Sequence, residues 1–190
     1  IPQVPIIIDS PMASKATAIT LTNPQEYDEE ARALYEMHGN RLLAIPNLRF
    51  TATAQESRMI NEMPGPKIIV SASGMADAGR ILHHLKHNLW HENCSVIIAG
   101  YQAEGTTGRA IISGEKYVRI LRERISVNAE IYFLEGFSAH ADKNDLLKWL
   151  SGFKEKPKKI FLVHGEEEAK KKAAEEAKKK IVEDAKKKAA

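Results

Sequence analysis

Short apolar runs alternate along the chain with segments whose apolar residues recur at helical spacing. Uninterrupted apolar runs of this length are typical of buried strands. Strands separated by helices are typical of a largely parallel sheet. The pattern therefore predicts an α/β fold, with a mostly parallel sheet and helices on both faces. The predicted strands are Pro5–Ile8, Leu48–Phe50, Lys67–Val70, Ser95–Ala99, Tyr117–Leu121, Val127–Leu134 and Lys159–Val163.

Capping residues mark the predicted helices between these strands. Ser10 precedes Pro11, and proline is favoured in the first turn of a helix. Thr53 and Glu56 have the spacing of a capping box, which predicts a helix ending before Pro64. Three other helices are predicted. The first opens at Asn23-Pro24, and the last covers Asp145–Leu150. The one between them follows Gly74 and carries Ile81, Leu82, Leu85 and Leu89 on one face.

Composition limits the class of protein. The chain has 190 residues, enough for one good-sized domain or for one domain plus part of another. Its net charge of +3 permits an anionic partner without requiring one. Its one cysteine, Cys94, lies in an apolar run, so we expect a small core residue and a cytoplasmic protein. No apolar run reaches the ~18 residues of a membrane span. The chain has neither an initiator Met nor a signal peptide, so we expect a fragment that begins inside a domain.

The C-terminal segment consists almost entirely of Glu, Ala and Lys. Five Glu–Lys pairs, the first Glu166 with Lys170, are spaced i,i+4, which supports a helix. The apolar stripe of this helix is mostly alanine, so it would bury little surface. We expect residues 169–190 to form a solvated helical tail whose simple composition suits non-native sequence. A basic nucleic-acid-binding arm is the alternative.

Two histidines follow predicted strands. His140 comes after Val127–Leu134, and His164 ends Lys159–Val163. Functional groups of α/β proteins gather beyond the carboxyl ends of strands, and imidazole can bind a metal or transfer a proton. Spacing alone favours the other interpretation, in which both are ordinary turn or capping histidines. A further trio, His83, His87 and His91, has metal-ligand spacing, but no acid or cysteine completes the set.

Two glycine-bearing loops also follow strands. Ser71–Arg80 and Gly100–Arg109 each contain glycines at the spacing of a phosphate-binding loop, but Arg80 and Thr106 stand where that motif needs lysine. Free backbone amides and the adjacent arginines favour a contact with phosphate. Each loop is a weak phosphate signature, however, and the residues alone still favour tight turns without a ligand.

Six motifs, taken in order, resemble the metallo-β-lactamase/β-CASP family of nucleases. The likeness covers roughly residues 1–168. It is greatest to the branch that includes the endonuclease subunit of the eukaryotic pre-mRNA cleavage and polyadenylation factor and its bacterial and archaeal relatives. The motifs are Ile8–Ala13, Val70–Met75, Gly79–Leu85, Ile97–Thr106, Phe137–Asp142 and Val163–Glu166.

This resemblance implies a fold and a set of roles. In the family, a β-CASP domain is inserted into a metallo-β-lactamase domain, and two zinc ions lie in the cleft between them. His140 matches the catalytic histidine that protonates the leaving oxygen, and His164 matches a zinc ligand. Zinc-bound hydroxide would attack phosphorus. The residues implied to contact the RNA backbone are Ser73, Gly74, Met75, Arg80, Gly105, Thr106 and Arg109.

The chain also departs from the family pattern. The His-x-His-x-Asp-His cluster is absent, and a single histidine cannot hold a catalytic zinc ion. We therefore expect a β-CASP domain lacking its start (1–133), a short return segment of the metallo-β-lactamase domain (134–168) and the tail (169–190). Alone, this chain should be inactive and hold no zinc. The full-length enzyme would use two Zn²⁺, and its partners would be single-stranded RNA and the missing N-terminal metallo-β-lactamase half.

Three functions follow, in order of support. The first is a metal-dependent ribonuclease acting on single-stranded RNA in RNA processing or decay, either as an endonuclease or as a 5′ exonuclease. The second is a catalytically silent β-CASP module that binds RNA or serves assembly. The third, a nucleotide-binding α/β domain, is disfavoured by the two incomplete phosphate loops. A homodimer stays an open option, and no membrane partner is expected.

Overall fold

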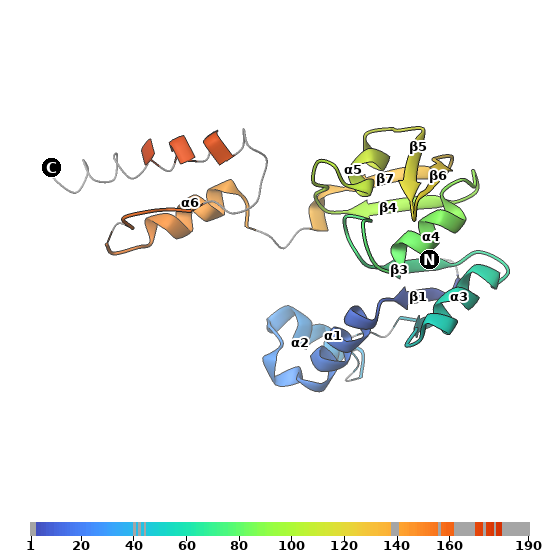
Figure 1. Ribbon diagram of the computed structural model, residues 1–190. Coiled ribbons are helices and arrows are strands. Elements are labelled where there is room, and N and C mark those ends of the chain that lie inside the picture. Colours follow the sequence, from blue (N-terminus) through green and yellow to red (C-terminus); the bar gives the residue numbers. More distant parts are fainter. Residues whose placement is uncertain are drawn as a thin grey trace.

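The structure is a computed structural model that describes residues 3–39, 41, 43, 45–137, 141–155, 157–161, 170–172, 174–176 and 178–179. Two parallel sheets and one antiparallel hairpin make up its β structure. Helices form most connections between the strands (Figure 1). The predicted α/β class with parallel sheets is confirmed.

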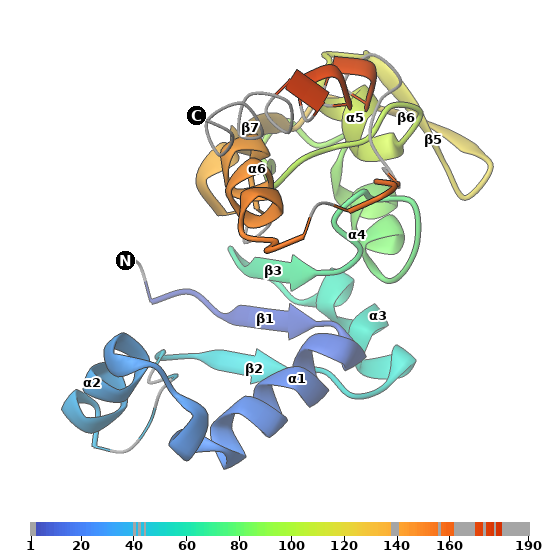
Figure 2. The same ribbon diagram turned by 90° about the vertical axis from the view of Figure 1, so that its left-hand side faces the viewer.

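The first sheet has three parallel strands in the order β2-β1-β3. Figure 2 shows them side by side, and Ile8 of the central strand lies opposite Phe50 and Val70. Parallel neighbours require crossover connections, which here contain helices. The elements are β1 (Ile6–Asp9), α1 (Pro11–Thr22), η1 (Pro24–Glu26), α2 (Glu29–Met37), β2 (Leu48–Phe50), α3 (Ala54–Glu62) and β3 (Ile68–Ser71).

The second sheet pairs β4 with β7 in parallel, and β5 and β6 form the antiparallel hairpin. The main core lies where α4, α5 and the hairpin meet β4, and it includes Leu89, Ile98, Ile111 and Ile120. Cys94 packs against this core. The elements are α4 (Ile81–Asn88), β4 (Ser95–Ala99), α5 (Thr107–Ile112), β5 (Tyr117–Ile120), β6 (Glu123–Ser126) and β7 (Glu130–Leu134).

Local capping explains where the helices begin. Ser10 caps α1, and Thr53 and Glu56 form the predicted capping box of α3. The helix predicted to open at Asn23-Pro24 starts later than expected, because Pro24 begins only the short η1 turn. The Asp28 carboxylate then accepts a hydrogen bond from the Ala31 amide and starts α2.

Other differences lie in the second half of the chain. The stretch Val127–Leu134 is a strand only from Glu130, since the Asn128 and Ala129 amides bond to the Leu89 carbonyl. Neither β6, rich in charge, nor the six-residue α5 was predicted. Residues 159–161 of the strand expected at 159–163 are not in a strand, and residues 162 and 163 lie outside the described residues.

The last described segments are helical. Residues 170–172, 174–176 and 178–179 form helical turns, and α6 (Lys143–Ser151) lies beside them in Figure 1. The Lys143 ammonium and the Glu176 carboxylate form an ion pair of 2.6 Å between the two. Among the described residues, no helix has both the length and the apolar character needed to cross a membrane.

Candidate nucleic-acid interface

The two glycine-bearing loops meet at the carboxyl ends of β3 and β4. Gln102 of the second loop is almost fully buried, with 2% of its surface exposed. Its side-chain amide donates to the Gly74 carbonyl of the first loop at 2.9 Å, and it also lies near the Gly100 and Tyr101 carbonyls. Because one buried side chain bonds to both loops, their relative position is fixed.

Backbone contacts reinforce this pairing. The Gly108 amide donates to the Met75 carbonyl at 3.0 Å, and the Thr107 amide donates to the Asp77 carboxylate at 2.8 Å. Gly108 leaves room for this contact, since a Cβ at that position would lie 1.7 Å from Gln102 Oε1 and 3.1 Å from the Met75 carbonyl oxygen. We call residues 71–80 and 100–109, joined in this way, the paired loops.

The paired loops contain all seven residues predicted to contact RNA. Gly74 and Gly105 are exposed, whereas Met75 and Arg109 are partly buried. The Thr106 hydroxyl caps α5 by accepting from the Arg109 amide, so Arg109 lies in the first turn of that helix. Ser73 lies in the first of the two loops, near Gly74. The predicted RNA contacts therefore lie on loops that are bonded to each other, and their binding to RNA stays a prediction.

A second polar cluster lies at the end of β1. Asp9 is completely buried, and its carboxylate accepts hydrogen bonds from four side chains that come from β2, α3 and α4 or from residues next to them. Arg80 Nη1 and the Thr51 hydroxyl donate to Oδ1, the former at 2.7 Å. The Ser57 hydroxyl and His84 Nε2 each lie 2.6 Å from Oδ2. We call these five residues the Asp9 cluster.

Electrostatics keep Asp9 ionised. Burial raises the pKa of its carboxyl group, but the hydrogen bonds from Ser57, Thr51, His84 and Arg80 outweigh burial and lower the pKa from 3.8 to about 2. A carboxyl group with this pKa holds no proton near neutrality and cannot act as a general acid. The Asp9 cluster therefore acts as a structural link between the first sheet and α4.

Arg80 belongs both to the paired loops and to the Asp9 cluster. It is one of the predicted RNA contacts, but its guanidinium also donates to Thr51 and to the Ala52 carbonyl, at 3.0 and 3.1 Å. Its side chain is 18% exposed. The structure thus gives Arg80 a structural role that the sequence did not predict, while its contact with RNA stays a prediction.

The predicted catalytic and metal-binding histidines, His140 and His164, lie outside the described residues. Among the residues that the structure does describe, no three His, Cys, Asp or Glu side chains gather into a metal site. This includes the trio His83, His87 and His91; the ring of His91 instead stacks on Trp90, with 3.6 Å between centroids.

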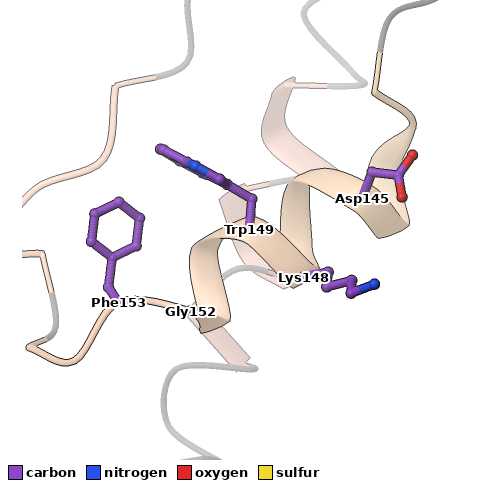
Figure 3. Close-up of a pocket in the computed structure, with 5 residues that line it drawn as sticks. All are labelled: Asp145, Lys148, Trp149, Gly152 and Phe153. Carbon is purple, nitrogen blue, oxygen red and sulfur yellow. The ribbon is translucent and has the colours of Figure 1, made fainter. Parts of the chain in front are cut away.

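A separate hollow lies on α6, away from the paired loops. Trp149 and Phe153 pack edge to face there, with ring centroids 4.9 Å apart (Figure 3). Gly152 and the two charged residues Asp145 and Lys148 complete its lining. The hollow is open and contains no predicted site residue, so we assign it no chemistry.

Sequence reasoning missed three of the residues that build these sites. Asp9 follows three isoleucines, and an acid at the end of such a buried run needs partners; this signal could have found it. His84 was missed because it lies beside several other histidines. Its spacing of four residues from Arg80, on the same helix face, could have indicated a shared partner. Gln102 has no such signal, because only the packing of the second loop on the first shows its role.

Comparison with known proteins defines the class. Residues 1–111 match the model of the Beta-Casp domain, and residues 124–187 match that of the Zn-dependent metallo-hydrolase RNA specificity domain. The first match covers more than half of the chain. The chain therefore belongs to the β-CASP family, as its motifs predict.

The individual relatives include a ribonuclease and transcription termination factors. The chain is 37% identical over 168 residues to ribonuclease TTHA0252 of Thermus thermophilus, a match that covers 88% of this chain and 38% of the relative. It is 34% identical over 168 residues to transcription termination factor FttA of Methanocaldococcus jannaschii, covering 86% and 26%. FttA of Thermococcus kodakarensis is 32% identical over 169 residues, covering 86% and 26%. The chain thus spans between a quarter and two fifths of these relatives.

Proposed function

We propose that the full-length protein is a zinc-dependent ribonuclease that hydrolyses phosphodiester bonds in single-stranded RNA. In this proposal, the paired loops hold the RNA backbone beside the reacting bond. The observation that carries it is the contact of Gln102 with Gly74, which joins the two predicted RNA-binding loops into one surface. The membership in the β-CASP family and the likeness to ribonuclease TTHA0252 support the reaction class.

The proposed roles of the two histidines come from the family motif. His140 would protonate the leaving oxygen, and His164 would be one ligand of the two zinc ions. A catalytic zinc ion needs three or more protein ligands, and in this proposal the remaining ones come from the metallo-β-lactamase half of the full-length protein.

The paired loops give this proposal a direct test. Gly108→Ala would place a methyl group against Gln102 and the Met75 carbonyl, which forces the loops apart. We expect the variant to bind a single-stranded oligouridylate about tenfold more weakly. A loss of this size corresponds to roughly one charge-assisted hydrogen bond to the RNA. Fluorescence anisotropy measures the affinity, and hydrogen exchange of the Gly108 amide reports the loop pairing.

Gly136→Ala is the matched control, since a Cβ at Gly136 meets no atom within 4 Å. It should leave both the affinity and the exchange rates in the paired loops unchanged. If Gly108→Ala loses amide protection in the loops but binds RNA as the control does, the loops do not hold RNA.

A further inference from the structure

The hairpin formed by β5 and β6 has one buried and one exposed face. Val118 and Ile120 point into the core, with 6% and 1% of their surface exposed. Side chains alternate along a strand, so Tyr117 and Arg119 of β5 face outward together with Arg124 and Ser126, their partners in β6. We call this outward surface, with Arg122 in the turn, the hairpin face.

The charges on the hairpin face repel one another and, among the described residues, are not neutralised by an ion pair. Arg119 and Arg124 lie directly opposite each other, and like charges in this position are unfavourable. The one acid of the two strands, Glu123, forms a 2.6 Å ion pair with Lys86 and therefore does not neutralise them. Within the described part of the chain, none of the three arginines has an ion-pair partner.

The two turn residues of the hairpin are unusual for their backbone conformation. Leu121 and Arg122 both have positive φ angles, 50° and 69°. Two-residue hairpin turns of this kind favour Asn and Gly, which adopt positive φ at little cost. The chain instead has an exposed arginine, Arg122, at the second position.

An aromatic ring stands among these cations. Tyr117 is half exposed, and the guanidinium carbon of Arg124 lies 3.9 Å from its ring centroid. Cationic side chains interleaved with an exposed aromatic ring are the combination that binds single-stranded nucleic acid, because the cations meet phosphates and the ring stacks on a base. Figures 1 and 2 both draw the hairpin on the side of the second sheet away from α6.

We propose that the hairpin face is a second binding site for single-stranded RNA, separate from the paired loops. Arg119, Arg122 and Arg124 contact backbone phosphates, and one base stacks on Tyr117. This inference rests on the proposed RNA substrate and extends it, since a strand held at two places is positioned along the protein over more than one nucleotide.

The test measures how the affinity for a fluorescein-labelled oligouridylate depends on salt. The double variant Arg119→Ala/Arg124→Ala should lower the slope of log K against log salt by about 1.4, because each phosphate contact on a single strand contributes about 0.7. Tyr117→Ala should weaken binding about fivefold or more with the slope unchanged, whereas Tyr117→Phe keeps the stacking ring and should bind as the parent chain does.

The control Arg49→Ala/Arg58→Ala removes the same charge from exposed residues of β2 and α3 and should leave the slope unchanged. Thermal melting verifies folding: the hairpin double variant should melt close to the parent chain, since the loss of the cation–π contact between Arg124 and Tyr117 offsets the removal of two opposed like charges.

Three outcomes overturn the proposal. If the hairpin variant matches the control in slope and affinity while Gly108→Ala weakens binding, only the hairpin site is wrong. If the parent chain binds no RNA, the hairpin site and the RNA contact of the paired loops both fail. If polyglutamate binds the parent chain as tightly as the RNA does, the face fits an acidic protein instead.

Discussion

Asp9→Ala is expected to lower the free energy of unfolding by about 3–5 kcal/mol, because it leaves the Arg80 guanidinium and His84 without their buried partner. The Asp9 cluster links β1 to α3 and α4, so the loss should spread to the whole first sheet. Urea denaturation measures it. Glu62→Ala, which removes an exposed acid from α3, is the control and should change stability by less than about 0.5 kcal/mol. A loss as small for Asp9→Ala would contradict the role of the cluster.

The same carboxylate should make stability depend on pH in the acid range. The pKa of Asp9 is lowered in the folded chain, from 3.8 to about 2. As the pH falls, the Asp9 carboxylate is therefore protonated in the unfolded chain before it is protonated in the folded chain, and the folded state becomes less stable. The contribution, about 2 kcal/mol, is fully present above pH 4 and disappears as the pH drops through about 2. Asp9→Asn should lack this component, which a comparison of urea midpoints over that range would detect.

In the full-length protein, His140→Ala is expected to reduce the rate of RNA cleavage by about 10²–10⁴-fold while zinc stays bound. His164→Ala should reduce cleavage and also release zinc. A proton donor acts in the transition state, whereas a ligand acts before the chemistry begins. Single-turnover cleavage together with metal analysis after dialysis separates the two roles.

His87→Ala is the matched control for both substitutions, since His87 is an exposed histidine of α4 and should keep both activity and zinc. The roles are reversed if His140→Ala loses zinc and His164→Ala keeps it. If neither substitution slows cleavage, both are ordinary turn histidines.

The strands that the sequence predicts well are those with uninterrupted apolar residues. β1, β3 and β4 each consist of an apolar run, so their sequences carry the signal directly. Burial was predicted less well, since Ile68 and Val70 of β3 and Ile97 of β4 are exposed on one face. β6 lacks an apolar run, because its first two residues are charged: Glu123 forms an ion pair with Lys86, and Arg124 is exposed to solvent. The strand therefore contributes little apolar surface to the core. α5 was missed because six residues hold too few turns for a helical period to emerge.

The candidate sites were predicted only in part. The glycines and arginines of the two loops are visible as local motifs, so their place at the strand ends could be anticipated. Their joining through Gln102 depends on contacts between residues that are 28 positions apart. The Asp9 cluster likewise joins residues separated by up to 75 positions. Spacing along one segment carries no information about such contacts.

The central claim is tested most directly by measuring cleavage of a single-stranded RNA by the full-length protein and by this 190-residue chain. We expect the full-length protein to hydrolyse the RNA, to lose activity on dialysis against a chelator and to regain it with zinc. This chain alone should bind RNA without cleaving it and without retaining stoichiometric zinc. A full-length protein that holds zinc and binds RNA but leaves it intact would contradict the ribonuclease proposal and favour a silent RNA-binding module.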